Sequence, residues 1–304
     1  MDAGSRDRPL LALLIRLAAI VGFSTMAALI KLASDRGIHL VEIIFWRQAV
    51  TLPLIVGWVL LNGGLVRLAT RRPGTHGLRA AYGMAGMVLN FGAVILLPLA
   101  EATVLNFTAP IWAVILSTLL LKEQVGIWRW SAVLLGFFGI LVIAQPAGGQ
   151  LPLFGSLVGL GAAFMIALIS IQIRDLGRTE EPVTIVFWFS AISTLATLPL
   201  MLFFAAAHPL EDWLLLLGIG LTGTWGQLLV TAALRYGAVA SVIVMDYSAL
   251  IWATLFGWAL FDALPPATTW LGAPLIVAAG LVIAWREHLR KSVIQAASAT
   301  TDGT

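Results

Sequence analysis

The sequence predicts an all-α integral membrane protein with ten transmembrane helices, arranged as two inverted-topology repeats of five helices around a central cavity. Three observations lead to this fold class. Hydrophobic residues make up 60% of the chain and charged residues only 11%, whereas soluble domains have about 25% charged residues. The apolar residues form ten long runs, and several features of the first half return in the second half.

The ten apolar runs are the predicted membrane spans. A helix of about 20 apolar residues crosses a hydrocarbon core that is about 30 Å thick. Glycine, proline or charged residues separate successive runs. The predicted spans are residues 10–33, 41–62, 77–98, 101–121, 127–145, 152–173, 183–205, 212–235, 238–261 and 268–286. The first run has no cleavage site of small residues, so we expect a retained helix rather than a signal peptide.

Lysine and arginine residues predict the orientation of these spans. If the N-terminus is cytoplasmic, fourteen of them fall in cytoplasmic segments, and only Lys31 and Arg36 fall in outer ones. Cytoplasmic loops are enriched in Lys and Arg, so we expect both termini in the cytoplasm and the protein in the cell inner (plasma) membrane. Because the basic residues lie in loops rather than on one face, the pI of about 9.7 does not indicate nucleic-acid binding.

An internal repeat divides the chain. The hairpin of Asn106 to Ala144 turns at Lys122-Glu123, and a weaker copy runs from Leu250 to Ala284. The stretch VEIIFW at 41–46 also aligns with VTIVFW at 183–188. Two copies of one unit account for these matches.

The repeat predicts the domain boundaries and the topology. We expect a first repeat at 1–147, a second at 148–286, and a disordered cytoplasmic tail at 287–304. Five spans per copy is an odd number, so the second copy crosses the membrane in the opposite sense. Inverted repeats are typical of secondary transporters, which bind substrate between the halves and work by alternating access.

Several motifs resemble those of EamA-type members of the drug/metabolite transporter superfamily. They are the FWR element Phe45 to Arg47, the segment LAEATVLNFTAPIWAVI with the LKE turn, and the run GILVIAQP. The resemblance implies a central cavity lined by helices one, three, four, six, eight and nine, with helices five and ten peripheral. It is nearest to the amino-acid exporter branch. The second copy departs from the pattern, because Phe189 stands where Arg47 does and Asp262 begins a turn without the Lys-Glu pair.

Asp246 is the deepest acid, about eight residues into its predicted span and beside Tyr247. A charged side chain at a helix centre is unfavourable by about 2.5–3.5 kcal/mol, so it calls for an explanation. Asp246 either binds a substrate ammonium group or carries a coupling proton, or else it is held structurally by backbone donors or by an arginine near the cytoplasmic end. Arg16 and Arg47 are expected to be structural, because long basic side chains reach the interface. The alternative for Arg47 is that it pairs with a carboxylate across the bundle.

Other deep side chains are predicted to contact substrate. Asn90 and Gln227 occupy roughly equivalent places in the two copies, and their amides both donate and accept hydrogen bonds. The alternative is that they join helices. Deep aromatic residues form a possible apolar or cation-accepting wall, although packing or lipid contact explains any one of them equally well. These are Tyr82, Trp112, Trp188, Trp225 and Tyr247.

Glu101 and Pro110 are candidates for a gate. Glu101 begins a predicted span on the outer side, where the helix dipole also favours an acid. Pro110 frees a backbone carbonyl and can kink its helix.

The leading hypothesis is a secondary exporter of amino acids, including aromatic ones, with broad specificity. The alternatives are uptake of a cofactor-like metabolite such as S-adenosylmethionine or riboflavin, and efflux of cationic drugs. No nucleotide-binding loop, cysteine or histidine cluster occurs, so we expect no ATP-driven pump, no metal site, no cofactor and no enzyme. A channel is disfavoured because no filter-like loop is present. The expected partners are lipid, a small molecule and a possible coupling proton, and the protein is expected to be a monomer or homodimer.

Overall fold

The computed structural model describes residues 9–120, 126–144, 151–233 and 245–301. Within these ranges all regular secondary structure is helical. Eight described helices are long and apolar enough to cross a membrane, and a shorter apolar helix covers Trp130–Ile143. The predicted span 238–261 is described only from residue 245 onward. The all-α membrane fold is therefore confirmed.

The helices follow the ten predicted spans. In the first half they are α1 Pro9–Asp35, α2 Leu40–Leu61, the short η1 Leu65–Leu68, α3 Pro73–Leu96, α4 Leu99–Asn106, α5 Ala109–Leu120 and α6 Ile127–Ala144. In the second half they are α7 Leu153–Leu176, α8 Pro182–Thr197, η2 Leu198–Leu200, α9 Met201–Phe204, α10 Leu210–Ala233, η3 Met245–Ser248, α12 Ala249–Phe261 and α13 Ala267–Thr301.

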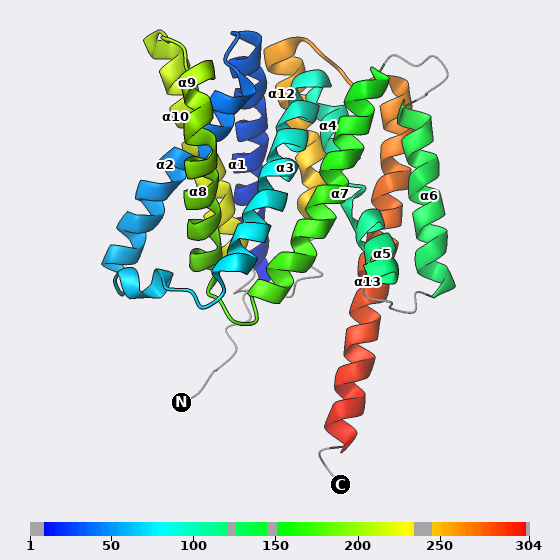
Figure 1. Cartoon of the computed structure of the whole chain (residues 1–304). Coiled ribbons are helices and arrows are strands. Elements are labelled where there is room, and N and C mark those ends of the chain that lie inside the picture. The colour runs from blue at the N-terminus through cyan, green and yellow to red at the C-terminus, as the bar shows by residue number, and fades with distance from the viewer. Residues whose placement is uncertain (1–8, 121–125, 145–150, 234–244, 302–304) are drawn as a thin grey trace.

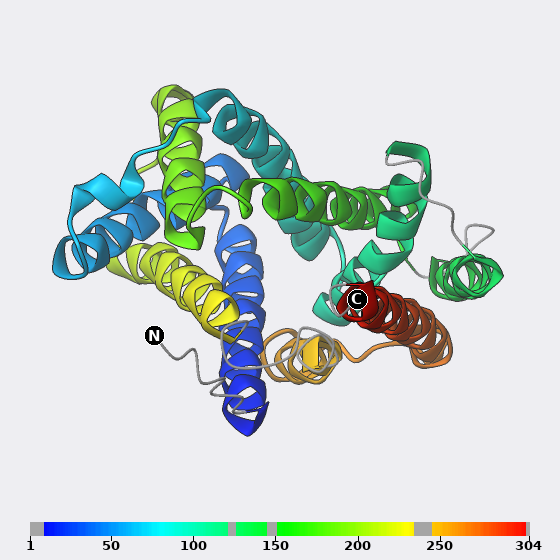
Figure 2. The same ribbon diagram turned by 90° about the horizontal axis from the view of Figure 1, so that it is seen from below.

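The two halves run in opposite directions. Helix α1 begins at the end of the molecule where α13 finishes, whereas α7 begins at the opposite end (Figure 1). The packing follows the same exchange of halves. Helix α1 packs on α10, and their counterparts in the other half, α7 and α3, pack on each other in the same way. Three further helices of the first half each pack on their own counterpart in the second half: α2 on α8, α4 on α12 and α6 on α13. Figure 2 shows α6 and α13 at one edge of the bundle, the peripheral position that the resemblance implies for helices five and ten.

The fourth span is discontinuous, and the described part of its counterpart, the ninth span, begins with a 3₁₀ turn that runs directly into α12. In the fourth, α4 ends at Asn106 and α5 begins at Ala109. Pro110 has no N–H and its ring crowds the carbonyl four residues earlier, so a straight helix cannot continue through it. In the ninth, the 3₁₀ turn η3 precedes α12, with Ser248 at the junction. In transporters built from inverted repeats, substrate sites are often formed by discontinuous spans.

The C-terminal helix differs from its prediction. Helix α13 continues to Thr301, whereas the sequence predicted a disordered tail from residue 287. Residues 287–301 contain no glycine or proline, so no residue in this stretch ends the helix.

Candidate functional site

The break in the fourth span lies beside η3 inside the bundle. The Phe107 ring, at the end of α4, lies edge-on to the Tyr247 ring of η3, with 5.0 Å between centroids. Helix α12, which follows η3, packs on α4. Helix α1 contacts both η3 and α12 and adds Arg16. We call this group the broken-helix site and define it as Arg16, Asn106, Phe107, Asp246 and Tyr247.

An ion pair lies at the broken-helix site. Arg16 Nε donates to Asp246 Oδ1 and Arg16 Nη2 donates to Asp246 Oδ2, both at 2.6 Å. The Arg16 side chain is 14% exposed and that of Asp246 is 36% exposed, so the pair is accessible at its carboxylate side. The sequence left open whether Asp246 binds substrate, carries a proton or is held by a structural partner. The structure shows an arginine partner, Arg16. Two-point guanidinium–carboxylate contacts are among the strongest hydrogen-bonded pairs, and each partner needs an opposite charge at this depth.

Two buried polar atoms without partners in the described ranges belong to Asn106, at the end of α4, and to Ser248, two residues after Asp246. Asn106 Oδ1 and Ser248 Oγ are buried and make no hydrogen bond to the described residues. Buried polar atoms in proteins are nearly always hydrogen-bonded, so these groups remain available to a bound molecule. Together the site offers a cation, an anion, an amide oxygen, a hydroxyl and two aromatic rings.

Of the residues predicted to bind substrate, Asp246 and Tyr247 lie at the broken-helix site. Three predicted tryptophans lie outside it. Trp112, on α5, packs edge-on against Phe137 and Phe164, and its buried Nε1 has no hydrogen-bond partner in the part of the chain that the structure describes. Trp188, on α8, donates from Nε1 to the Leu68 carbonyl at 2.9 Å. Trp225 is 60% exposed and lines a surface groove between α1 and α10.

The remaining predicted contact residues lie on α3 and α10. Tyr82 and Asn90 are half-buried on α3, and Gln227 is half-buried on α10. Both helices pack against α1, which carries Arg16. Substrate contact by these three residues stays a prediction, as does the central cavity.

Glu101 is fully buried on α4, and its Oε1 accepts a hydrogen bond from Thr269 Oγ1 at 2.9 Å. This bond ties α4 to the start of α13. Glu101 Oε2 has no partner among the described residues. A gating role for Glu101 or Pro110 stays a prediction, while the structure does show the helix interruption just before Pro110.

Replacing Thr269 with valine tests the bond to Glu101. Valine keeps the shape but leaves the buried carboxyl group without its hydrogen-bond donor, so we expect the free energy of unfolding to fall by about 1–3 kcal/mol. Thermal unfolding in detergent measures the change. Thr222→Val is the matched control, because the Thr222 hydroxyl bonds only to carbonyls of its own helix. Equal melting temperatures for both variants would argue against a structural role for the Glu101 bond.

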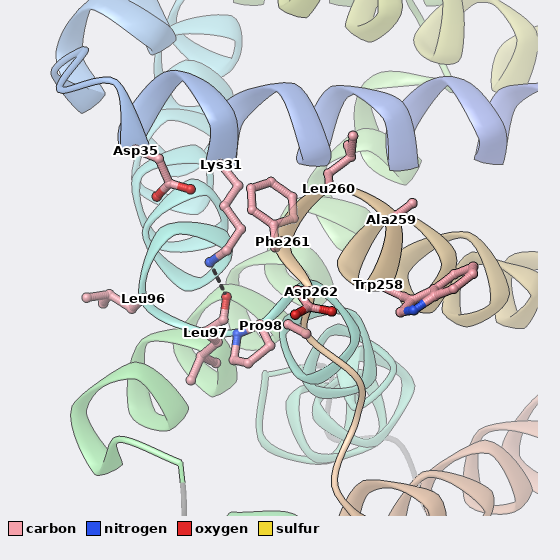
Figure 3. A pocket seen from close by; sticks show the side chains of 11 residues that line it. Lys31, Asp35, Leu96, Leu97, Pro98, Trp258, Ala259, Leu260, Phe261 and Asp262 are labelled. Carbon is pink, nitrogen blue, oxygen red and sulfur yellow. Dashed lines mark hydrogen bonds between the residues drawn. The ribbon is translucent and has the colours of Figure 1, made fainter.

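A pocket of about 760 Å³ opens between the end of α1, the end of α3 and α12 (Figure 3). We call it the outer pocket, after the orientation that the basic residues predict. Lys31 Nζ donates to the carbonyls of Val94 and Leu97 at 3.1 and 2.8 Å, which fixes the lysine against the end of α3. Asp35 and Asp262 also line the pocket. The outer pocket therefore combines a fixed cation with two carboxylates.

The sequence did not indicate the importance of Arg16, Arg47 and Arg79. Arg16 and Arg47 were expected to be structural, and Arg79 was counted among cytoplasmic charges. All three lie within helices, and Arg47 and Arg79 are buried. In the sequence, the feature that set these arginines apart was their position inside apolar runs, where a charged residue is unusual. No group of three acidic or histidine side chains in the described part of the chain is arranged to hold a metal ion.

Comparisons with known proteins agree with this architecture. The model of the EamA-like transporter family matches residues 10–145 and again residues 153–285. The pseudopaline exporter CntI of Pseudomonas aeruginosa is 31% identical over 89% of this chain and 94% of its own length. The riboflavin transporter of Vibrio cholerae is 30% identical over 90% of this chain and 92% of its own length.

A solved crystal structure also resembles this chain. It has a TM-score of 0.60 and 22% sequence identity, and the alignment covers 90% of this chain and 96% of the other. At this identity the likeness concerns the fold alone.

Proposed function

The chain belongs to the EamA-like transporter family, and from this premise we propose that it exports amino acids, including aromatic ones, by alternating access. The protein is a multi-pass membrane transporter of small molecules and not an enzyme. What we propose beyond this is the identity of the substrate, the direction of its transport and the residues that bind it.

The main support for this proposal is the ion pair between Arg16 and Asp246 of η3, beside the break in the fourth span. An amino acid carries a carboxylate and an ammonium group. Its carboxylate can take the place of Asp246 beside Arg16, while its ammonium group takes the place of Arg16 beside Asp246. Every charge then keeps an opposite partner, so the exchange avoids the cost of an unpaired buried charge.

The break in the fourth span and the turn η3 also supply a moving part. The short α4 and the turn η3 carry Phe107 and Tyr247, whose rings touch. Substrate that separates Asp246 from Arg16 also loosens η3 from α1, because these side chains join the two elements. On the cytoplasmic orientation that the basic residues predict, the outer pocket with Lys31, Asp35 and Asp262 is the exit.

Riboflavin transport is the second candidate, favoured by the similarity to the Vibrio cholerae riboflavin transporter. Riboflavin has no carboxylate or ammonium group, so it would not exchange charges with the ion pair. The two functions therefore differ in their dependence on Asp246.

Efflux from proteoliposomes that contain the purified full chain tests the proposal. Vesicles are loaded with labelled Phe, Met or Thr, and riboflavin or unlabelled Phe is added as a competitor. We expect saturable Phe efflux that excess Phe slows and riboflavin does not. Absence of flux for every amino acid, or stronger competition by riboflavin, would overturn the amino-acid assignment.

A further inference from the structure

Two arginines lie inside the bundle and form no ion pair with any described carboxylate. Arg47 on α2 is 8% exposed and Arg79 on α3 is 7% exposed. Throughout the described ranges, every Asp or Glu that forms an ion pair does so with a basic residue other than these two. An unpaired charge at such depth is strongly unfavourable, so buried arginines in membrane helices normally face an anion.

The neighbours of these arginines leave donors unused. Arg47 Nη1 donates to Gln48 Oε1, and the Arg79 guanidinium lies over the Phe189 ring, 4.5 Å from its centroid. Ser190 Oγ on α8 donates to Gln48 Oε1 at 3.4 Å, and its neighbour in the chain, Phe189, covers Arg79, so α8 links the surroundings of the two arginines. Arg47 Nε, Gln48 Nε2, and Arg79 Nε and Nη1 are all buried without a hydrogen-bond partner among the described residues. We call Arg47, Gln48 and Arg79 the arginine cluster.

Glycines make room for both guanidinium groups. A Cβ at Gly223 on α10 would lie 3.2 Å from Arg47 Nε, and a Cβ at Gly83 on α3 would overlap Arg79 Nη1. The repeat is asymmetric here, because Phe189 occupies the second-half position of Arg47 and covers Arg79 instead. The second repeat therefore has no arginine that corresponds to Arg47.

We propose that the arginine cluster binds an organic dicarboxylate. Two guanidinium groups carry two positive charges and present planar pairs of N–H donors, which match the two oxygens of a carboxylate. A molecule with two carboxylates neutralises both arginines and gives partners to their unused donors, and Gln48 Nε2 adds one more donor. The inference deepens the proposed function and rests on it, since it assigns substrates with a second carboxylate, such as acidic amino acids, to this carrier.

Ligand-dependent thermal stability of the full chain in phosphatidylcholine nanodiscs tests the proposal. The probes are succinate and glutarate, with acetate and inorganic phosphate as comparisons. A ligand that binds only the folded state raises the melting temperature in a saturable way. We expect saturable stabilisation by a dicarboxylate, with at least about tenfold weaker apparent affinity for acetate and phosphate, because one group cannot pair with both arginines.

Variants link the effect to the arginine cluster. Arg47→Gln and Arg79→Gln should each weaken dicarboxylate binding about tenfold or more, the effect expected from losing charge-assisted hydrogen bonds. Both variants should fold, since each removes a buried charge that has no carboxylate partner. Arg72→Gln is the matched control, because Arg72 is more exposed and pairs with Asp175 at 2.6 Å. Arg72→Gln should retain the wild-type affinity.

The outcomes separate this inference from the proposed function. Unchanged affinity in both cluster variants, or phosphate or acetate binding as tightly as succinate, overturns the dicarboxylate site. Efflux of labelled Phe by the wild-type protein is measured in parallel. Lost efflux with intact, cluster-dependent succinate binding contradicts the amino-acid proposal alone, and normal efflux without succinate binding contradicts the cluster alone.

Discussion

Replacing Asp246 with asparagine is expected to reduce the initial rate of phenylalanine efflux by about thirtyfold or more. Asparagine keeps the shape of the side chain but leaves Arg16 without its anion and offers no charge to the substrate ammonium group. Removing one partner of a hydrogen-bonded charge pair costs about 2 kcal/mol or more, which corresponds to about thirtyfold in rate. Efflux from proteoliposomes at matched protein density measures the loss.

The ion pair between Arg72 and Asp175 supplies the control. It has the same 2.6 Å separation, but Asp175 is 54% exposed and the pair lies away from the broken-helix site. Exposed pairs contribute about 0–1 kcal/mol, so Asp175→Asn should leave efflux nearly unchanged. Wild-type efflux in the Asp246→Asn variant would contradict the role of Asp246, and it would also count against a cation-specific transporter.

Replacing Gly272 with alanine is expected to destabilise the protein strongly. Helices α6 and α13 approach closely where Gly139 faces Gly272, and a Cβ at Gly272 would lie 2.7 Å from the Gly139 carbonyl oxygen. Backbone atoms cannot move aside without separating the helices. Small residues allow this packing, and overpacking costs about 1–3 kcal/mol. Thermal unfolding in detergent should therefore show a melting temperature several degrees lower.

Gly57→Ala is the matched control for the helix contact. Gly57 also lies within a helix, α2, but a Cβ there would meet nothing within 4 Å. Alanine favours a helix over glycine by about 1 kcal/mol, so this variant should melt at or above the wild-type temperature. If Gly272→Ala melted together with Gly57→Ala, the close approach of α6 and α13 would be wrong.

Most of the fold was predictable because helix length, hydrophobicity and turn residues are local properties. The predicted spans 41–62 and 152–173 agree closely with α2 and α7. Interruptions were harder to predict, because they depend on backbone contacts as well as composition. Pro110 indicated the break in the fourth span, whereas η3 contains no proline or glycine to indicate its 3₁₀ turn.

The candidate site was predicted only in part, because its partners come from distant parts of the chain. Asp246 stood out as a deep acid, but Arg16 lies 230 residues away and its pairing depends on the packing of α1 against η3. Arg47 was expected to reach the interface like other long basic side chains. Its burial depends on α10, where Gly223 leaves room for the guanidinium group. Single-sequence patterns contain no information about such contacts.

The most direct test of the central claim is an experimental structure of the protein with phenylalanine bound. We expect the phenylalanine carboxylate to lie within hydrogen-bond distance of Arg16 and its ammonium group to lie within hydrogen-bond distance of Asp246. The direct contact between Arg16 and Asp246 should then be broken. An intact Arg16–Asp246 pair with phenylalanine bound elsewhere in the bundle would contradict it.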